Sequence, residues 1–113
     1  MATLYGIKNC DTVKKARSWL DGQGIEYRFH DFRADGLSAG LLEDLEKQLG
    51  WETLLNRRGT TWRKLEEAQR ENLDRAKALT LMLAQPSLIK RPVLETGDKT
   101  LIGFTPDYYA SEL

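Results

Sequence analysis

Cys10 is the single cysteine of this chain, and it lies in the stretch YGIKNCDTVKKA at residues 5–16. Lys8 precedes it by two residues, and Lys14 and Lys15 follow it. A short apolar run ends just before the cysteine, and a helical pattern begins just after it. Because a helix N-terminus presents unpaired N–H groups and the positive end of the helix dipole, this position and Lys8 favour the thiolate, the nucleophilic form of cysteine. The alternative is a small buried hydrophobe that fills a turn.

The chain lacks the partner thiol that many redox-active cysteines have. Val13 stands where the second cysteine of a Cys-x-x-Cys pair would be. A chain with one thiol cannot close an internal disulfide, so a reactive Cys10 must form a mixed disulfide with an external thiol or attack an oxyanion. Glutathione is the most abundant external thiol in a reducing cytoplasm, and we expect it as the co-substrate.

The elements that must position Cys10 follow from the hydrophobic pattern. Residues 3–7 are partly β-branched and aromatic and predict a strand. Residues 11–22 repeat apolar side chains at helical spacing, and residues 25–30 alternate between apolar and polar side chains like a half-buried strand. A β-α-β order of this kind makes the two strands parallel, with Cys10 at the start of the connecting helix.

The rest of the chain predicts a block of helices and then a hairpin. The expected helical segments are 38–49, with Ser38 as its cap, 51–55, 61–68 and 73–85. Residues 92–95 and 100–104 predict an antiparallel hairpin, and residues 107–113 a closing helix. The order β-α-β, helices, β-β-α gives one mixed four-stranded sheet, which is an α/β, thioredoxin-like fold. We expect a single domain over residues 1–113 with a helical insertion at about 38–85.

Composition limits the classes of partner. The chain has 113 residues, and its seventeen Lys and Arg balance seventeen Asp and Glu, so no global charge attracts nucleic acid or an anionic membrane. No segment reaches the roughly 18 apolar residues of a membrane span. A lone cysteine and a polar N-terminus favour a reducing cytoplasm, and nothing predicts a metal site. We expect a cytoplasmic monomer without a bound cofactor.

Two arginine-rich stretches could bind anions. Residues 56–64, NRRGTTWRK, surround a glycine, and residues 89–92 read IKRP. Guanidinium groups bind carboxylates and oxyanions through paired hydrogen bonds. The simpler interpretation of the first stretch is a solvated basic turn. Arg91 differs, because a residue before proline is held extended, and a proline at the start of the third strand in thioredoxin-like folds is typically cis and lies against the reactive cysteine. On that basis we expect a cis Pro92 with Arg91 directed at Cys10.

Three segments together resemble a known family: YGIKNCDTVKKARSWL, LLNRRGTTWRKL and LIKRPVL. They resemble the glutaredoxin-linked arsenate reductase (ArsC/Spx) family, most closely its YffB-like subgroup and more distantly the Spx regulators. The resemblance implies a thioredoxin-like core with a helical insertion. By position it implies that Cys10 is the nucleophile and that Arg91, Pro92 and Arg58 belong to the site, with the adjacent Arg57 as the alternative to Arg58.

Two departures from the family pattern argue against arsenate as the substrate. The reductases hold the oxyanion with a third arginine on the last strand, where residues 101–105 of this chain, LIGFT, have none. The residues before the cysteine, GIKN at 6–9, also differ from the reductases' His-Asn-Pro-Ala.

The function that we expect is a glutathione-dependent thiol reductase or transferase. Cys10, Arg91 and Arg58 are the expected catalytic residues, glutathione is the co-substrate, and a second glutathione or a glutaredoxin resolves the intermediate. The expected substrate-binding residues are Lys8, Asn9, Thr12 and Pro92. The alternatives are an arsenate reductase with a modified oxyanion site and an Spx-like regulator that binds RNA polymerase, although such regulators typically carry the Cys-x-x-Cys pair that this chain lacks.

Overall fold

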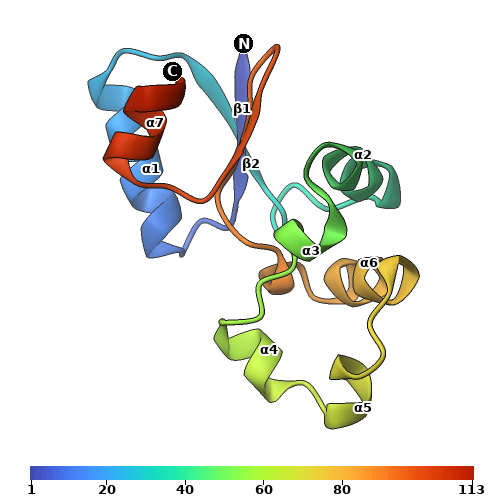
Figure 1. The fold of residues 1–113 in the computed structure, drawn as a ribbon. Helices are drawn as coiled ribbons and strands as arrows, with labels where there is room; N and C mark the ends of the chain where they lie inside the picture. Colours follow the sequence, from blue (N-terminus) through green and yellow to red (C-terminus); the bar gives the residue numbers. More distant parts are fainter. The chain divides into compact units, whose positions relative to one another are not determined.

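A computed structural model describes all residues from 1 to 113 (Figure 1). The chain forms two compact units, of which the first combines Met1–Gly36 with Arg91–Leu113 and the second is Leu37–Lys90. The second unit corresponds to the predicted helical insertion. That the two units act as one domain stays a prediction.

The first unit contains a mixed four-stranded sheet in the order β2-β1-β3-β4. Its strands are β1 (Ala2–Gly6), β2 (Tyr27–Asp31), β3 (Val93–Glu95) and β4 (Thr100–Ile102). β1 pairs in parallel with β2 and antiparallel with β3, and β3 pairs antiparallel with β4. The predicted thioredoxin-like α/β fold is therefore confirmed, including the parallel β-α-β unit and the C-terminal hairpin.

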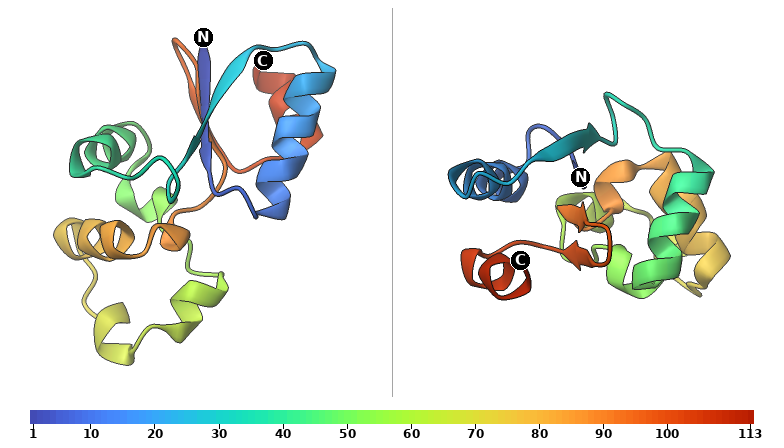
Figure 2. Two further views of the ribbon diagram at one scale, coloured as in Figure 1. Left: turned by 180° about the vertical axis from the view of Figure 1, so that it is seen from behind. Right: turned by 90° about the horizontal axis from the view of Figure 1, so that it is seen from above.

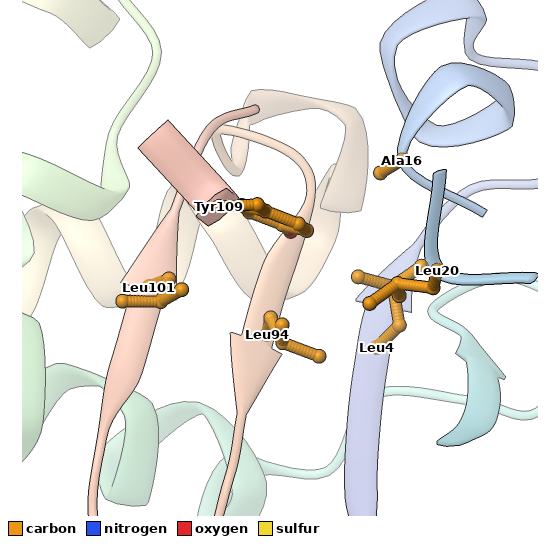
Figure 3. Close-up of a cluster of buried hydrophobic side chains, with 6 residues drawn as sticks. All are labelled: Leu4, Ala16, Leu20, Leu94, Leu101 and Tyr109. Carbon is orange, nitrogen blue, oxygen red and sulfur yellow. The ribbon is translucent and has the colours of Figure 1, made fainter. Parts of the chain in front are cut away.

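Two helices of the first unit, α1 (Asp11–Gly22) and α7 (Pro106–Glu112), cover the same face of this sheet (Figure 2). Their contact with the sheet is a cluster of buried side chains drawn in Figure 3. Leu4, Leu94 and Leu101 occupy facing positions on the three neighbouring strands β1, β3 and β4, so they point to one face together. The helices add Ala16, Leu20 and Tyr109. This cluster fixes α1, and with it the position of Cys10, on the sheet.

The second unit consists of short helices. They are α2 (Ala39–Leu49), α3 (Trp51–Leu54), α4 (Thr60–Lys64), α5 (Glu67–Arg70), α6 (Arg75–Ala84) and the 3-10 turn η1 (Pro86–Leu88). The predicted cap is confirmed, since the Ser38 hydroxyl accepts a hydrogen bond from the N–H of Leu41 at 3.1 Å. Asp74 caps α6 in the same way through the N–H of Lys77, at 2.8 Å.

Several predicted boundaries were wrong for physical reasons. The single helix predicted over 61–68 is two helices, α4 and α5, because the buried Leu65 is extended (φ −68°, ψ 148°) and Glu66 opens α5 through a capping box. β4 ends at Ile102 rather than 104, because Gly103 turns the chain at φ 77°. β2 runs from 27 to 31 instead of 25 to 30. No helix combines the length and apolar character that crossing a membrane requires.

Candidate functional site around Cys10

Cys10 is the N-cap residue of α1, as the sequence predicts. Its backbone is extended (φ −103°, ψ 123°), and its carbonyl accepts the first helical hydrogen bond, from the N–H of Lys14 at 2.9 Å. The thiol is half-buried, and no side chain caps the helix. Polar N-cap side chains normally accept from the first-turn N–H groups. The Cys10 side chain stands in that position, where the first-turn N–H groups and the helix dipole favour negative charge.

The chain leading to Cys10 is tied to the end of β2 by Asp31, a residue that the sequence analysis did not single out. The parallel register places Gly6 opposite Asp31. One carboxylate oxygen of Asp31, Oδ2, accepts the N–H of Lys8 at 3.0 Å. The other, Oδ1, accepts the N–H groups of Arg33 at 2.7 Å and Ala34 at 3.1 Å. Asp31 therefore joins the segment before the cysteine to the turn after β2.

Asp31 is buried, with 6% of its surface exposed. Burial by itself raises the pKa of this carboxyl, but the three backbone hydrogen bonds and the nearby Arg33 charge outweigh it, so the pKa of Asp31 lies below its ordinary value. The carboxylate is ionised at neutral pH and accepts charge-assisted hydrogen bonds, which are the stronger kind. The loop before Cys10 is thus held by an ionic anchor.

Arg91 and Pro92 lie at the same end of the sheet as the Cys10 segment. Tyr5 near the end of β1 pairs with Val93 at the start of β3, so the residues before Val93 and those that follow Tyr5 leave the sheet at the same end. The Arg91–Pro92 peptide bond is cis, as predicted. The Pro92 carbonyl accepts the N–H of Gly103 at 2.8 Å, which fixes the start of β3. Pro92 is buried and Arg91 half-buried, and the direction of Arg91 toward Cys10 stays a prediction.

The other predicted binding residues of the first unit flank the thiol in the chain. Lys8 and Asn9 are exposed, and Thr12 is half-buried in the first turn of α1. The Cys10 N–H donates to the carbonyl of Ile7 at 3.2 Å, which closes a tight turn over Lys8 and Asn9. This turn and the Asp31 anchor together set the path by which the chain enters α1.

Arg58 and its neighbour Arg57 both belong to the second unit, but their side chains have different surroundings. The Arg57 guanidinium lies over the rings of Trp51 and Trp62, 5.8 and 5.9 Å from their centroids, as in cation–π contacts. The Arg58 side chain is exposed, and its backbone N–H donates to Asn56 Oδ1 at 3.0 Å. Both arginines and Lys90 line a cavity of about 440 Å³ within this unit.

The chain is similar to known proteins over nearly its whole length. The profile of the ArsC family matches residues 5–111. The solved structure of a YFFB protein is 58% identical, covers 98% of this chain and 97% of its own, and superimposes with a TM-score of 0.92. An arsenate reductase (ArsC) related protein from Brucella melitensis is 56% identical, with coverage of 97% and 92% and a TM-score of 0.82. An uncharacterised protein of Haemophilus influenzae is 50% identical over 109 residues, which is 96% of each chain.

This chain belongs to the ArsC family, related to the arsenate reductases. Its similarity to the YFFB protein supports the predicted YffB-like subgroup.

Proposed function

We propose that the chain is a glutathione-dependent thiol reductase or transferase in which Cys10 forms a mixed disulfide with glutathione. The observation that carries the proposal is the place of Cys10: it is the N-cap of a 12-residue helix, no side chain competes for the first-turn N–H groups, and no second thiol exists. The proposed setting is a reducing cytoplasm, where glutathione is abundant.

The chemistry is thiol–disulfide exchange in two steps. The Cys10 thiolate attacks one sulfur of a glutathionyl disulfide, a Cys10–glutathione disulfide forms, and the other sulfur leaves as a thiolate. A second glutathione, or a glutaredoxin, then attacks the glutathione sulfur and releases reduced Cys10. An external thiol is required because the position three residues after Cys10 is Val13, a buried valine that packs on the core side of α1.

Cationic groups would hold the carboxylates of glutathione. Arg91 lies two residues before β3, at the end of the sheet where the chain after β1 also leaves it. Arg58 is the better candidate than Arg57 in the second unit, because the Arg57 guanidinium already lies over two tryptophan rings. Lys8, Asn9 and Thr12 would offer polar groups around the thiolate, and Pro92 would form a wall of the site.

The last strand favours a disulfide over arsenate as the substrate. β4 and the residue after its turn provide no cationic side chain: Thr100 is a neutral hydroxyl residue, Leu101 is buried, and Ile102 and Phe104 are half-buried. Removing one donor from an oxyanion site costs roughly a hundred- to thousand-fold in rate. Two arginines suffice for the two carboxylates of glutathione, whereas an arsenate-derived transition state would lack a donor here.

The experiment is intact-mass analysis after incubation with oxidised glutathione. The wild type should gain one glutathione, and Cys10→Ser none. Arg91→Ala should form the adduct roughly ten- to hundred-fold more slowly, because it loses a charge-assisted hydrogen bond to the ligand. Arg28→Ala is the matched control, since Arg28 is an exposed arginine of β2. An unmodified wild type would refute the reaction, and equal slowing by Arg28→Ala would refute the role of Arg91.

A further inference from the structure

The first unit has an open cavity of about 670 Å³ on α1 that the proposed reaction does not yet use. Volumes of this order are typical of sites for small molecules. Its lining comes from two places far apart in the sequence, one face of α1 and the segment that enters α7. The lining residues are Lys14, Lys15, Ser18, Trp19, Phe104 and Pro106.

The aromatic part of this cavity is held in place by the core. Trp19 packs edge-on against Tyr109 with ring centroids 5.6 Å apart, and Phe104 does so at 4.7 Å. Tyr109 is fully buried among the side chains of Figure 3. Because its two aromatic walls rest on one buried ring, this part of the cavity is formed before a ligand arrives, and ordering these rings costs little entropy. Such walls suit a flat apolar ligand, which stacks against them.

The charged part of the cavity suits an anion. Lys14 and Lys15 are both exposed, and neither forms an ion pair with a carboxylate of the chain. Ser18 adds a hydroxyl on the same helix. The cavity therefore combines two ammonium groups that no carboxylate neutralises with two half-buried aromatic rings, Trp19 and Phe104.

Lys14, one of the lining residues, lies one helical turn after Cys10. The N–H of Lys14 donates to the carbonyl of Cys10 at 2.9 Å, which closes the first turn of α1. Residues four apart on a helix are neighbours, with Cβ atoms about 5–6 Å apart. We propose that this cavity receives the aromatic, anionic part of the disulfide whose sulfur reacts with Cys10. The proposal rests on the proposed function and names its substrate class: a disulfide that carries negative charge on or next to a flat ring.

The reaction needs no further reagent. The Cys10 thiolate attacks one sulfur of the aromatic disulfide, and a bond forms between the Cys10 sulfur and the attacked sulfur. The bond inside the disulfide breaks, and the other half leaves as an aromatic thiolate that takes the electron pair of that bond. The released aromatic thiolate can be followed by its absorbance, and the adduct of a disulfide without a ring by intact mass, so the rate constant for the first step is measured in each case.

Three disulfides separate the contributions of ring and charge. Dithiobis(nitrobenzoate) is aromatic and anionic, dithiodipyridine is aromatic and neutral at pH 7, and dithiodiglycolate is anionic without a ring. The test variant is Lys14→Ala/Lys15→Ala, and the control is Lys47→Ala/Lys99→Ala, which removes two exposed lysines that do not line the cavity. Exposed ion pairs are weak, so the test variant should slow dithiobis(nitrobenzoate) by roughly two- to thirty-fold. It should leave dithiodipyridine within about two-fold.

Phe104→Leu tests the ring contact, and it should slow the two aromatic disulfides but not dithiodiglycolate. Because Phe104 packs on Tyr109, the thermal unfolding of the Phe104→Leu variant is measured alongside its reaction rates. The lysines are exposed, so the lysine variant tests the proposal independently of folding. If the lysine variant slows dithiodiglycolate as much as dithiobis(nitrobenzoate), the lysines act on charge in general and the cavity assignment fails. If the wild type reacts with none of the three disulfides, the proposed function of Cys10 fails instead.

Discussion

Asp31→Asn should release the segment before Cys10 while leaving the turn after β2 in place. The carboxylate accepts on Oδ2 from Lys8, and on Oδ1 from Arg33 and Ala34. An asparagine keeps one oxygen, and turning it toward the two donors of the turn leaves its NH₂ group facing the N–H of Lys8. Two donors then face each other, so the Lys8 hydrogen bond is lost.

The expected loss of stability follows from the one hydrogen bond between Lys8 and Asp31. Hydrogen bonds to charged groups contribute about 1.5–3 kcal/mol, so the free energy of unfolding of Asp31→Asn should fall by about that amount in urea. Amide hydrogen exchange at Lys8 should accelerate more than exchange within the sheet. Asp35→Asn is the matched control, because the Asp35 carboxylate belongs to the same turn but accepts from the N–H of Asp31, at 2.9 Å, and not from Lys8.

The difference in stability between wild type and Asp31→Asn should also depend on pH, and the pKa of Asp31 sets the direction of that dependence. The folded protein lowers the pKa of Asp31, so its stabilising contribution is present above the unfolded pKa, about 3.9, and is lost as pH falls through the folded pKa. The difference in stability between wild type and Asp31→Asn should therefore be full at pH 7 and shrink below about pH 4. Unchanged Lys8 exchange, or a difference that grows in acid, would refute the anchoring role.

Three further substitutions test the packing that positions α1 and the helical unit. Gly6→Ala places a Cβ 2.7 Å from Val13 Cγ2, so it should cost about 1–3 kcal/mol in urea unfolding, and adding Val13→Ala should recover part of that loss if the clash is the cause. Tyr109→Phe should be neutral or stabilising by about 1 kcal/mol in thermal unfolding, because the buried hydroxyl has no hydrogen-bond partner; a large loss would show a missed partner. Ser38→Ala should cost about 0.5–2 kcal/mol by removing the α2 cap, whereas Ser38→Gly should cost only a few tenths.

Local patterns in the sequence predicted the elements, since period and capping are properties of neighbouring residues. The place of Cys10 at the start of α1 and the Ser38 cap are examples. Asp31 was missed because its role depends on the strand register that brings Lys8 beside it, 23 residues away in the chain. Its place at a strand end, where Asp often bonds to the backbone of a turn, was the available signal.

The aromatic cavity could not be predicted for the same reason. Trp19 packs edge-on against the buried Tyr109 and so lies at the edge of the core. Its role as a wall of the cavity also needs Phe104, which lies near Trp19 only because α7 packs beside α1. The split between α4 and α5 depends on the burial of Leu65, which also is a tertiary effect.

The most direct test of the proposed function is steady-state turnover of a glutathionyl mixed disulfide. Reduced glutathione is the electron donor, and glutathione reductase reports the oxidised glutathione that forms as consumption of NADPH. The wild type should turn over the mixed disulfide with a rate that depends on glutathione and should reduce arsenate poorly, and Cys10→Ser should be inactive with both. Full activity in Cys10→Ser, or brisk reduction of arsenate with no activity on the mixed disulfide, would contradict the assignment.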